Sequence, residues 1–433
     1  MYRPALALVA PFLSLALNMP AAAQDNAALR QEIDLLKQQL QRMEQRLNGA
    51  EQTAASAQSQ AAQAQQRAAA APPAASSSAS AFNPAIGVVL DGRFGAASRT
   101  PAGARVPGFA LGDEAGAPRR GFGLGESEVT FSANVDQWLY GNLTLAFEDD
   151  AVAVEEAYFQ TTALPYGLTV KGGRFFSGIG YINEQHAHAW DFSDQNLPYR
   201  VLLNQQLNND GLQLRYLAPT PFFLEFGGEA ARGNTFPGGG ESKTAGTLAA
   251  FVHAGDDINE NSSWRAGVSH VRTKAEDRVT NDGADTFRGR GNLTILDAVY
   301  KWAPTGNPAS QHLKLQGEYL FRDEGGQFNG LDYQSAAQGF YLQGVYQFAP
   351  KWQFALRYDQ VQANNDDAAV VAGSVLETFN ETARRGTAAL TFFTSEFGRF
   401  RAQYALEQTR PETEHQLLFQ YTITLGAHGA HAY

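Results

Sequence analysis

The sequence predicts an all-β protein: a transmembrane antiparallel β-barrel of about 16 strands, preceded by a short N-terminal coiled-coil helix. Three observations lead to this fold class. Apolar and polar residues alternate along many short segments, these segments are joined in turn by tight turns and long polar loops, and four of the five tryptophans fall beside the tight turns. Together these features describe strands with one face in lipid and the other in water.

The composition excludes several other classes. The chain has 433 residues, of which 44% are hydrophobic and 18% charged. No apolar run approaches the roughly 18 residues that a transmembrane helix needs, which excludes a helical membrane protein. The net charge of -11 argues against a nucleic-acid partner. Because the chain has no cysteine, disulfides, thiolate metal sites and cysteine nucleophiles are excluded as well.

Residues 1–23 have the pattern of a secretory signal peptide. Arg3 provides a basic region, Ala5–Leu17 is apolar, and Ala21–Ala23 supplies small residues for cleavage. A short membrane anchor is the alternative, but the apolar stretch is too short to span a bilayer comfortably. We therefore expect the mature chain in the cell outer membrane of a Gram-negative bacterium, in contact with its lipid bilayer, with the N-terminal segment in the periplasm.

Residues 24–48 predict a short coiled-coil helix. Apolar residues recur at alternating intervals of four and three residues: Leu29, Ile33, Leu36, Leu40, Met43 and Leu47. A coiled coil with so few heptads is only marginally stable by itself. We therefore expect a homotrimer, in which the attached barrels raise the effective concentration of the helices. A single amphipathic helix lying on the protein is the alternative. The coiled coil could also contact peptidoglycan or a periplasmic partner.

Residues 49–81 are almost wholly Ala, Gln, Pro and Ser, which is typical of a spacer because such a segment cannot bury a core. The barrel is expected over residues 82–433, where the pattern changes to period two. The clearest case is the last strand, in which Leu417 and Phe419 alternate with Gln416 and Gln420. In an outer-membrane barrel the apolar face meets lipid, whereas in a soluble sandwich it would form the core.

The connections favour the barrel over the sandwich. Sixteen strands are expected, beginning near Ala85, Glu126, Asn142, Val152, Leu168, Gly211, Phe222, Thr247, Trp264, Leu293, His312, Phe340, Trp352, Thr387, Arg399 and His415. Connections after even-numbered strands are mostly tight, and those after odd-numbered strands are mostly long and polar, as in Lys274–Gly291. Trp138, Trp264, Trp302 and Trp352 lie at the tight turns, where an interfacial aromatic girdle belongs. This is the plan of an outer-membrane barrel.

A barrel of this size encloses water, which predicts a porin-like channel for the passive diffusion of small polar or ionic solutes. The pore-lining candidates are charged residues on the polar faces of the expected strands: Lys171, Arg215, Glu225, Lys314, Glu318, Arg322, Arg357 and Asp359. The negative charge of the barrel segment indicates a weak preference for cations. A non-conducting structural barrel with a periplasmic tether is a third alternative.

Residues 177–209, between the fifth and sixth expected strands, form an inward-loop candidate. This segment is long, aromatic and only moderately charged, whereas the other long loops are rich in Gly and Asp. A loop of this kind can fold into the lumen and narrow it. Such loops determine the selectivity of a channel through their charge and through the pore diameter that they leave.

The same segment contains the metal candidates, which are Glu184, His186, His188 and Asp191. Imidazole together with carboxylate suits Zn²⁺ or another divalent ion. The alternative is that both histidines only form hydrogen bonds within the loop, since a metal site needs three or four ligands. A second pair, His428 and His431, is expected on the periplasmic side. No cofactor is required by this interpretation, and Zn²⁺ is a candidate substrate or ligand.

No catalytic site is expected. Outer-membrane barrel enzymes combine a serine or an acid with a histidine on the outer wall or rim. Ser127 with His253 or His270 could be placed in such a scheme, but no spacing supports it. The sequence therefore predicts a protein without enzymatic activity.

Two resemblances add to these expectations. The order of signal, coiled coil, spacer and barrel resembles trimeric porins with an N-terminal periplasmic coiled coil, including the phosphate-selective and carbohydrate-selective porins. A sharper resemblance covers Gly121 to about Gly238 and the chain end. Its motifs are Gly125–Glu128, Val154–Tyr158, Gly173–Tyr181, Asn183–Phe192, Gln213–Thr220 and Leu425–His431. They resemble a proteobacterial outer-membrane family often labelled zinc-regulated TonB-dependent outer membrane receptor.

The second resemblance implies a receptor or uptake channel specific for zinc or a zinc chelate, with Glu184, His186, His188 and Asp191 as the residues to test. A TonB-dependent receptor has an N-terminal globular plug and about 22 strands. The residues before Phe82 show neither a plug nor an energy-coupling box. Zinc uptake therefore stands as the alternative to a general channel, without energy coupling.

Overall fold

The structure is a computed structural model, and it describes residue 37 and residues 84–99, 105–116, 118–148, 151–409 and 413–426. The chain divides into two units, Met1–Ser80 and Ala81–Tyr433. The expected signal peptide, the spacer and all of the expected coiled coil except Lys37, which is helical, lie outside the described residues. Within the described part of the chain, no helix is both long and apolar enough to cross a membrane.

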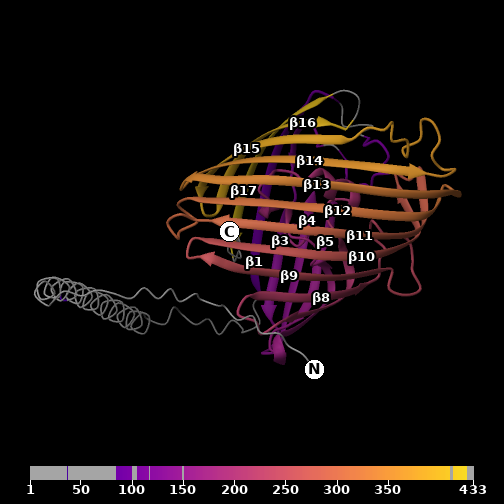
Figure 1. Cartoon of the computed structure of the whole chain (residues 1–433). Coiled ribbons are helices and arrows are strands. Elements are labelled where there is room, and N and C mark those ends of the chain that lie inside the picture. The colour runs from indigo at the N-terminus through magenta and orange to yellow at the C-terminus, as the bar shows by residue number, and fades with distance from the viewer. Residues whose placement is uncertain are drawn as a thin grey trace, which may run out of the picture. The chain divides into compact units, whose positions relative to one another are not determined.

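The second unit contains a closed antiparallel β-barrel (Figure 1). Strand β1 (Ala85–Ala97) pairs with the last strand, β17 (Glu414–Gly426), on one side. On the other side it pairs with β2 (Gly121–Leu124) and then with β3 (Ser127–Asn134). Because β2 and β3 are two halves of one interrupted strand, the seventeen labelled strands form a wall of sixteen. The predicted all-β barrel of about sixteen strands is confirmed.

From β3 onwards each strand pairs with the next one in the chain. These strands are β4 (Leu139–Glu148), β5 (Ala151–Thr161), β6 (Leu168–Phe176), β7 (Asn208–Leu217), β8 (Phe223–Ala231), β9 (Thr247–Asn259), β10 (Ser262–Thr280), β11 (Asp285–Trp302), β12 (His312–Phe328), β13 (Leu331–Ala349), β14 (Trp352–Asp366), β15 (Ala383–Ser395) and β16 (Gly398–Gln408). In the described part of the second unit three short helices accompany them: η1 (Pro165–Gly167), η2 (Ala187–Ala189) and α2 (Leu197–Leu203).

The two faces of the wall have opposite polarity, as the alternation in the sequence predicts. In β17, Leu417 and Phe419 point outward and are 37% and 46% exposed, whereas Gln416 and Gln420 point inward and are buried. The same order holds for outward Leu342 and inward Gln343 in β13. An apolar outer face and a polar inner face suit a barrel surrounded by lipid and exclude the soluble sandwich, whose apolar faces would be buried.

One predicted loop is wrong. The segment Lys274–Gly291 is mostly strand, because β10 continues to Thr280, β11 starts at Asp285, and only residues 281–284 form a turn. Several outward residues here are charged, as at Glu276, Arg288 and Arg290, which is expected where the outer face of a strand meets water instead of lipid. The apolar alternation that marks a strand in the sequence therefore disappears in this segment. The four tryptophans of the expected girdle do lie at or beside the connections of one rim: Trp138, Trp264, Trp302 and Trp352.

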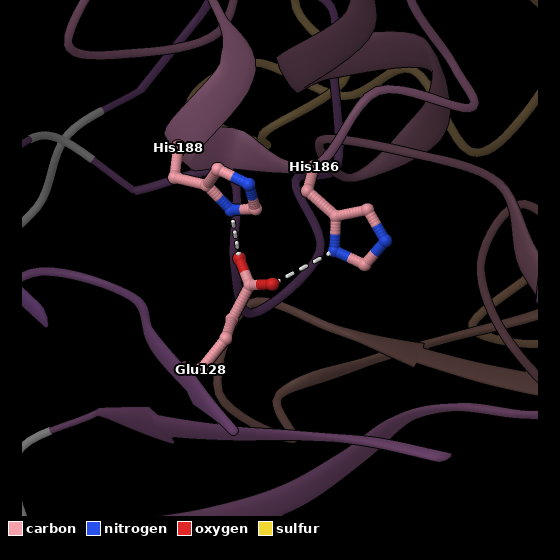
Figure 2. Close-up of side chains that lie close together, drawn as sticks. All are labelled: Glu128, His186 and His188. Atoms are coloured by element: carbon pink, nitrogen blue, oxygen red, sulfur yellow. Dashed lines mark hydrogen bonds and ion pairs between the residues drawn. The ribbon is translucent and has the colours of Figure 1, made fainter. Parts of the chain in front are cut away.

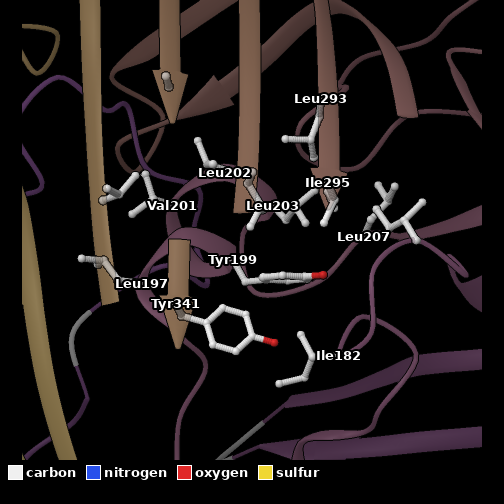
Figure 3. Close-up of a cluster of buried hydrophobic side chains, with 14 of the residues drawn as sticks. Ile182, Leu197, Tyr199, Val201, Leu202, Leu203, Leu207, Leu293, Ile295 and Tyr341 are labelled. Carbon is white, nitrogen blue, oxygen red and sulfur yellow. The ribbon is translucent and has the colours of Figure 1, made fainter. Parts of the chain in front are cut away.

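The largest hydrophobic core lies inside the barrel, where the segment between β6 and β7 is folded (Figure 3). Leu197, Leu202 and Leu203 of this segment are fully buried. They belong to one cluster with Leu293 and Ile295, which point inward from β11. The inner face of the wall, which carries many polar residues, is therefore apolar on the part that receives the segment.

Candidate functional site

Residues 177–207, called the inserted loop below, lie between the end of β6 and the start of β7 inside the barrel. Their backbone and side chains bond to widely separated strands. Ser177 donates a hydrogen bond to Glu229 of β8 at 2.6 Å, and the backbone N–H of Ser193 donates to Gln403 of β16 at 2.8 Å. The carbonyl of Trp190 accepts a hydrogen bond from Arg401 at 2.9 Å. The inserted loop thus crosses the lumen.

Helix α2 fixes the second part of the inserted loop. Asn196 caps its start, because its side chain accepts a hydrogen bond from the backbone N–H of Tyr199 at 3.0 Å, and Pro198 occupies the first turn. Asn204 ends it in the left-handed conformation, with φ 52°. All seven helical residues are buried, so packing rather than intrinsic propensity holds so short a helix.

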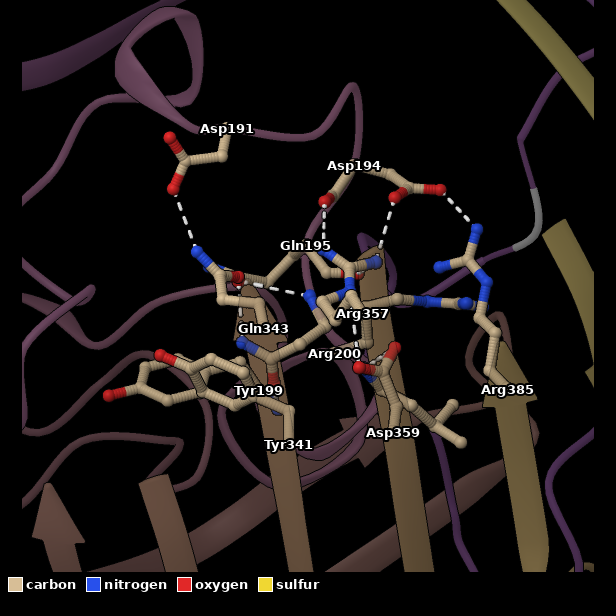
Figure 4. A network of polar contacts seen from close by, with 12 residues as sticks. Asp191, Asp194, Gln195, Tyr199, Arg200, Tyr341, Gln343, Arg357, Asp359 and Arg385 are labelled. Atoms are coloured by element: carbon tan, nitrogen blue, oxygen red, sulfur yellow. Dashed lines mark hydrogen bonds and ion pairs between the residues drawn. The ribbon is translucent and has the colours of Figure 1, made fainter. Parts of the chain in front are cut away.

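A buried polar network surrounds α2 (Figure 4). The carboxylate of Asp194 binds Arg357 at 3.0 Å and also binds Arg385. Arg385 in turn lies 3.2 Å from Glu407, which pairs with Arg200 of α2 at 3.0 Å. Burial raises the pKa of the Asp194 carboxyl, but the two arginines outweigh burial and hold that pKa well below its usual range.

The eight pore-lining candidates all have side chains inside the barrel, where they form two groups. Lys171, Arg215 and Glu225, on β6 to β8, remain partly accessible, with 12%, 20% and 16% of their side-chain surface exposed. The more buried group is Glu318, Arg322, Arg357 and Asp359, and Lys314 lies between the two groups because 11% of its side-chain surface is exposed.

The inserted loop explains most of this burial. Lys314 pairs with Asp191 at 2.7 Å, and Glu318 accepts a hydrogen bond from the Tyr199 hydroxyl at 2.8 Å. Asp359 accepts one from the backbone N–H of Leu197 at 3.3 Å. The alternation in the sequence identifies the inward face of each strand, but it carries no information on which inward residues a distant loop covers.

The two loop histidines meet a glutamate of the barrel wall (Figure 2). Nδ1 of His188 lies 2.6 Å from Oε1 of Glu128, and Nδ1 of His186 lies 3.1 Å from Oε2 of the same carboxylate. His186 also lies 3.0 Å from Glu155 and 3.1 Å from Glu156, both on β5. Burial lowers the pKa of His186, but its hydrogen bonds to the three glutamates outweigh burial and raise that pKa well above the ordinary value.

The other two predicted metal ligands lie elsewhere, so the prediction of one site with all four residues is wrong. Glu184 pairs with Arg215 and lies 3.9 Å from Lys171. Asp191 pairs with Lys314, as described above. Cations of the barrel wall therefore hold both carboxylates away from the histidines. The carboxylates that do lie beside the histidines are on β3 and β5, and only the inward position of Glu128 could have indicated one of them from the sequence.

Of the candidates for catalysis, Ser127 bonds to the backbone N–H of Asp91, His253 lies 3.3 Å from Glu225, and His270 lies 3.0 Å from Thr294. In the described part of the chain no hydrogen bond joins the serine to either histidine. His428 and His431 lie outside the described residues.

No family model matches the chain. An uncharacterized protein of Aquifex aeolicus (strain VF5) is 28% identical over 339 residues, which cover 73% of this chain and 71% of that protein.

Three solved structures are similar in fold. The trimer form of OmpT, an outer membrane protein of Vibrio cholerae, has a TM-score of 0.51 and 11% identity, over 78% of this chain and 98% of that one. The outer membrane channel DcaP of Acinetobacter baumannii has a TM-score of 0.51 and 12% identity, over 79% and 96%. The anion-selective porin from Comamonas acidovorans has a TM-score of 0.50 and 12% identity, over 79% and 99%. The likeness shows that this chain shares the barrel fold of outer-membrane porins.

Proposed function

We propose that the protein is a porin-like channel of the outer membrane for the passive diffusion of small polar or ionic solutes. The observation that carries this proposal is the polarity of the wall, with apolar residues outside and charged residues inside a closed barrel. Two of the similar structures are an anion-selective porin and an outer membrane channel, which supports the same class of function. The proposal includes no enzymatic activity.

The solute path runs beside β6, β7 and β8. Lys171 and Arg215 on this side keep partly exposed side chains, whereas Arg357 on β14, halfway around the wall of sixteen strands, is buried against the inserted loop. The inserted loop also contacts this side, through Ser177 and Glu184, so the solute path passes beside the partly exposed Glu184 and Arg215 and away from the buried contacts of α2. The charge and position of the loop set which solutes pass.

Single-channel recording in planar lipid bilayers tests this function. Because the chain has no cysteine, Lys171→Cys carries a single thiol, and a bulky thiol-reactive methanethiosulfonate reagent should lower its conductance. Ser335→Cys, a conservative change at a buried inward position of β13, is the matched control and should not respond. Wild-type protein without steady openings would contradict the channel and favour the structural barrel. Equal responses of the two variants would contradict the path.

A zinc-specific or zinc-chelate-specific uptake channel is the second candidate function, and one observation favours it: His186 and His188 meet Glu128 inside the barrel. Under this alternative, Zn²⁺ blocks the single-channel current while it occupies the path, and the double variant His186→Ala/His188→Ala loses the block. A current that Zn²⁺ leaves unchanged in wild-type protein would exclude zinc uptake.

The same proposal includes a homotrimer with its N-terminal segment in the periplasm, where the coiled coil could contact peptidoglycan or a partner. The heptad in residues 24–48 supports the trimer, and one of the similar structures is a trimer form. Deletion of Asp25–Leu47 should reduce the number of chains in the oligomer in detergent, which light scattering after size-exclusion chromatography measures. An unchanged number of chains would show that the helix is not needed for assembly.

A further inference from the structure

Acidic groups are in excess where the inserted loop meets β3 and β5. Six ionisable side chains gather there: Glu126, Glu128, Glu155, Glu156, His186 and His188. Among the described residues, no lysine or arginine forms an ion pair with any of the four glutamates. Even with both histidines protonated, the group keeps an excess of negative charge in a region shielded from water. Such a charge is costly unless a cation compensates it.

The spacing of the donor atoms suits one metal ion. The ligand atoms of Glu128, His186 and His188 all lie within 4.8 Å of one another, and so do those of Glu126, Glu128 and Glu155. Ligands about 2.0 to 2.2 Å from a zinc ion lie about 3.4 Å apart at the tetrahedral angle. Small side-chain shifts would therefore place these atoms around a single ion, with Glu128 common to both sets.

A second observation points to a missing cation independently of the histidines. Oε1 of Glu126 is buried and has no hydrogen-bond partner. Glu126 lies at the break between β2 and β3, and its donor atom is within 4.8 Å of those of Glu128 and Glu155, which are also carboxylates. A buried acceptor without a donor, surrounded by like charges, is what a bound cation would relieve.

We propose that Glu128, His186 and His188 bind one divalent first-row transition-metal ion of the Zn²⁺ type, with Glu126 and Glu155 able to complete its coordination. Imidazole ligands select this class over Mg²⁺ and Ca²⁺, which prefer oxygen alone. Nε2 of His186 lies 3.1 Å from Glu156, so this carboxylate can orient the imidazole ring from the outer side. The ion fastens the inserted loop to β3, and its binding does not depend on channel activity.

Metal titration of the full chain, folded in detergent and treated with chelator, tests the site. Calorimetry with Zn²⁺ should give one ion per chain, and Co²⁺ should give the visible absorption of a low-symmetry site with nitrogen ligands. Glu128→Gln, which keeps the shape of the side chain, should weaken Zn²⁺ binding at least 100-fold. His186→Ala/His188→Ala should abolish it.

The matched control removes two other histidines. His270→Ala/His415→Ala, at exposed positions bonded to Thr294 and Tyr404, should bind Zn²⁺ as wild type does. His428→Ala/His431→Ala tests the chain end in the same way, and loss of binding there alone would overturn the proposal. Equal Zn²⁺ affinities of wild type and Glu128→Gln would also overturn the proposal. Heat-modifiable mobility on a gel would show that both proteins are folded in that comparison. Conductance has no part in these measurements, so their failure would leave the channel function standing.

Discussion

The two halves of the inserted loop are held to the barrel in different ways. Its first half carries His186 and Glu184, whose side chains remain 21% and 34% exposed and bind charged groups on the shorter strands β3, β5 and β7. Its second half is α2, which is wholly buried between apolar residues and the arginines of β14 and β15. The second half therefore contributes most to fixing where the loop lies, although Ile179 and Ile182 of the first half belong to the same apolar cluster. The first half presents the groups that can meet a solute or an ion.

The largest effect should follow from removing the apolar contacts of the second half. Leu202→Ala/Leu203→Ala deletes two fully buried side chains, at a cost of about 2–5 kcal/mol each. Helix α2 should then leave the wall, so that single-channel currents become larger and noisier and the apparent melting temperature in detergent falls. Leu331→Ala, at an exposed position, is the control and should leave both unchanged. If Glu128→Gln destabilises the protein more than this double variant, the first half fixes the loop and the comparison is reversed.

The next effect should come from the charges around α2. Asp194→Asn leaves Arg357 and Arg385 without their shared carboxylate and should cost about 3–5 kcal/mol of unfolding free energy.

Asp194 also predicts how the free energy of unfolding changes with pH. Its pKa is lower in the folded protein than the unfolded value of about 3.9, so its contribution is complete above that value and is lost as the pH falls through the folded pKa. The charged groups that face it are Arg200, Arg357, Arg385, Asp359 and Glu407. Unfolding curves between pH 7 and pH 3 should show an acid loss in wild type that is smaller in Asp194→Asn. Parallel curves would show that another group controls the acid response.

The smallest effects should separate two glutamates of the first half in chelator-treated protein. Glu128→Gln weakens the bonds to both histidines and should cost about 1.5–3 kcal/mol. Glu126→Gln replaces a carboxyl that lies among other carboxyl groups and whose Oε1 has no hydrogen-bond partner, so it should cost nothing or stabilise the protein slightly. Melting temperatures in detergent measure both. Equal losses of melting temperature in the two variants would mean that the Glu126 carboxyl accepts a hydrogen bond of its own.

The sequence predicted the features that depend on residues close together in the chain, and it did not predict those that depend on contacts between distant residues. The wall follows a local rule, so the alternation of Leu417 and Phe419 with Gln416 and Gln420 was enough to assign the faces of β17. The rule failed over Lys274–Gly291, where no lipid imposes it.

The inserted loop depends on contacts between distant parts of the chain, which no local pattern encodes. Its composition indicated that it could fold inward, but its partners could not be read from it. Glu184 and Asp191 are near the histidines in sequence, yet Arg215 and Lys314 draw them away. Glu128 is 60 residues from His188 and bonds to it directly.

The span of these contacts constrains how the barrel is assembled. Arg200 bonds to Glu407 across 207 residues, and the carbonyl of His188 bonds to Arg399 across 211, so the loop's last partners are among the last strands to be made. The barrel closes only when β17 pairs with β1. The loop can therefore complete its contacts only when β14 to β16 are in place, so the strands made shortly before the barrel closes are also the ones that hold the loop.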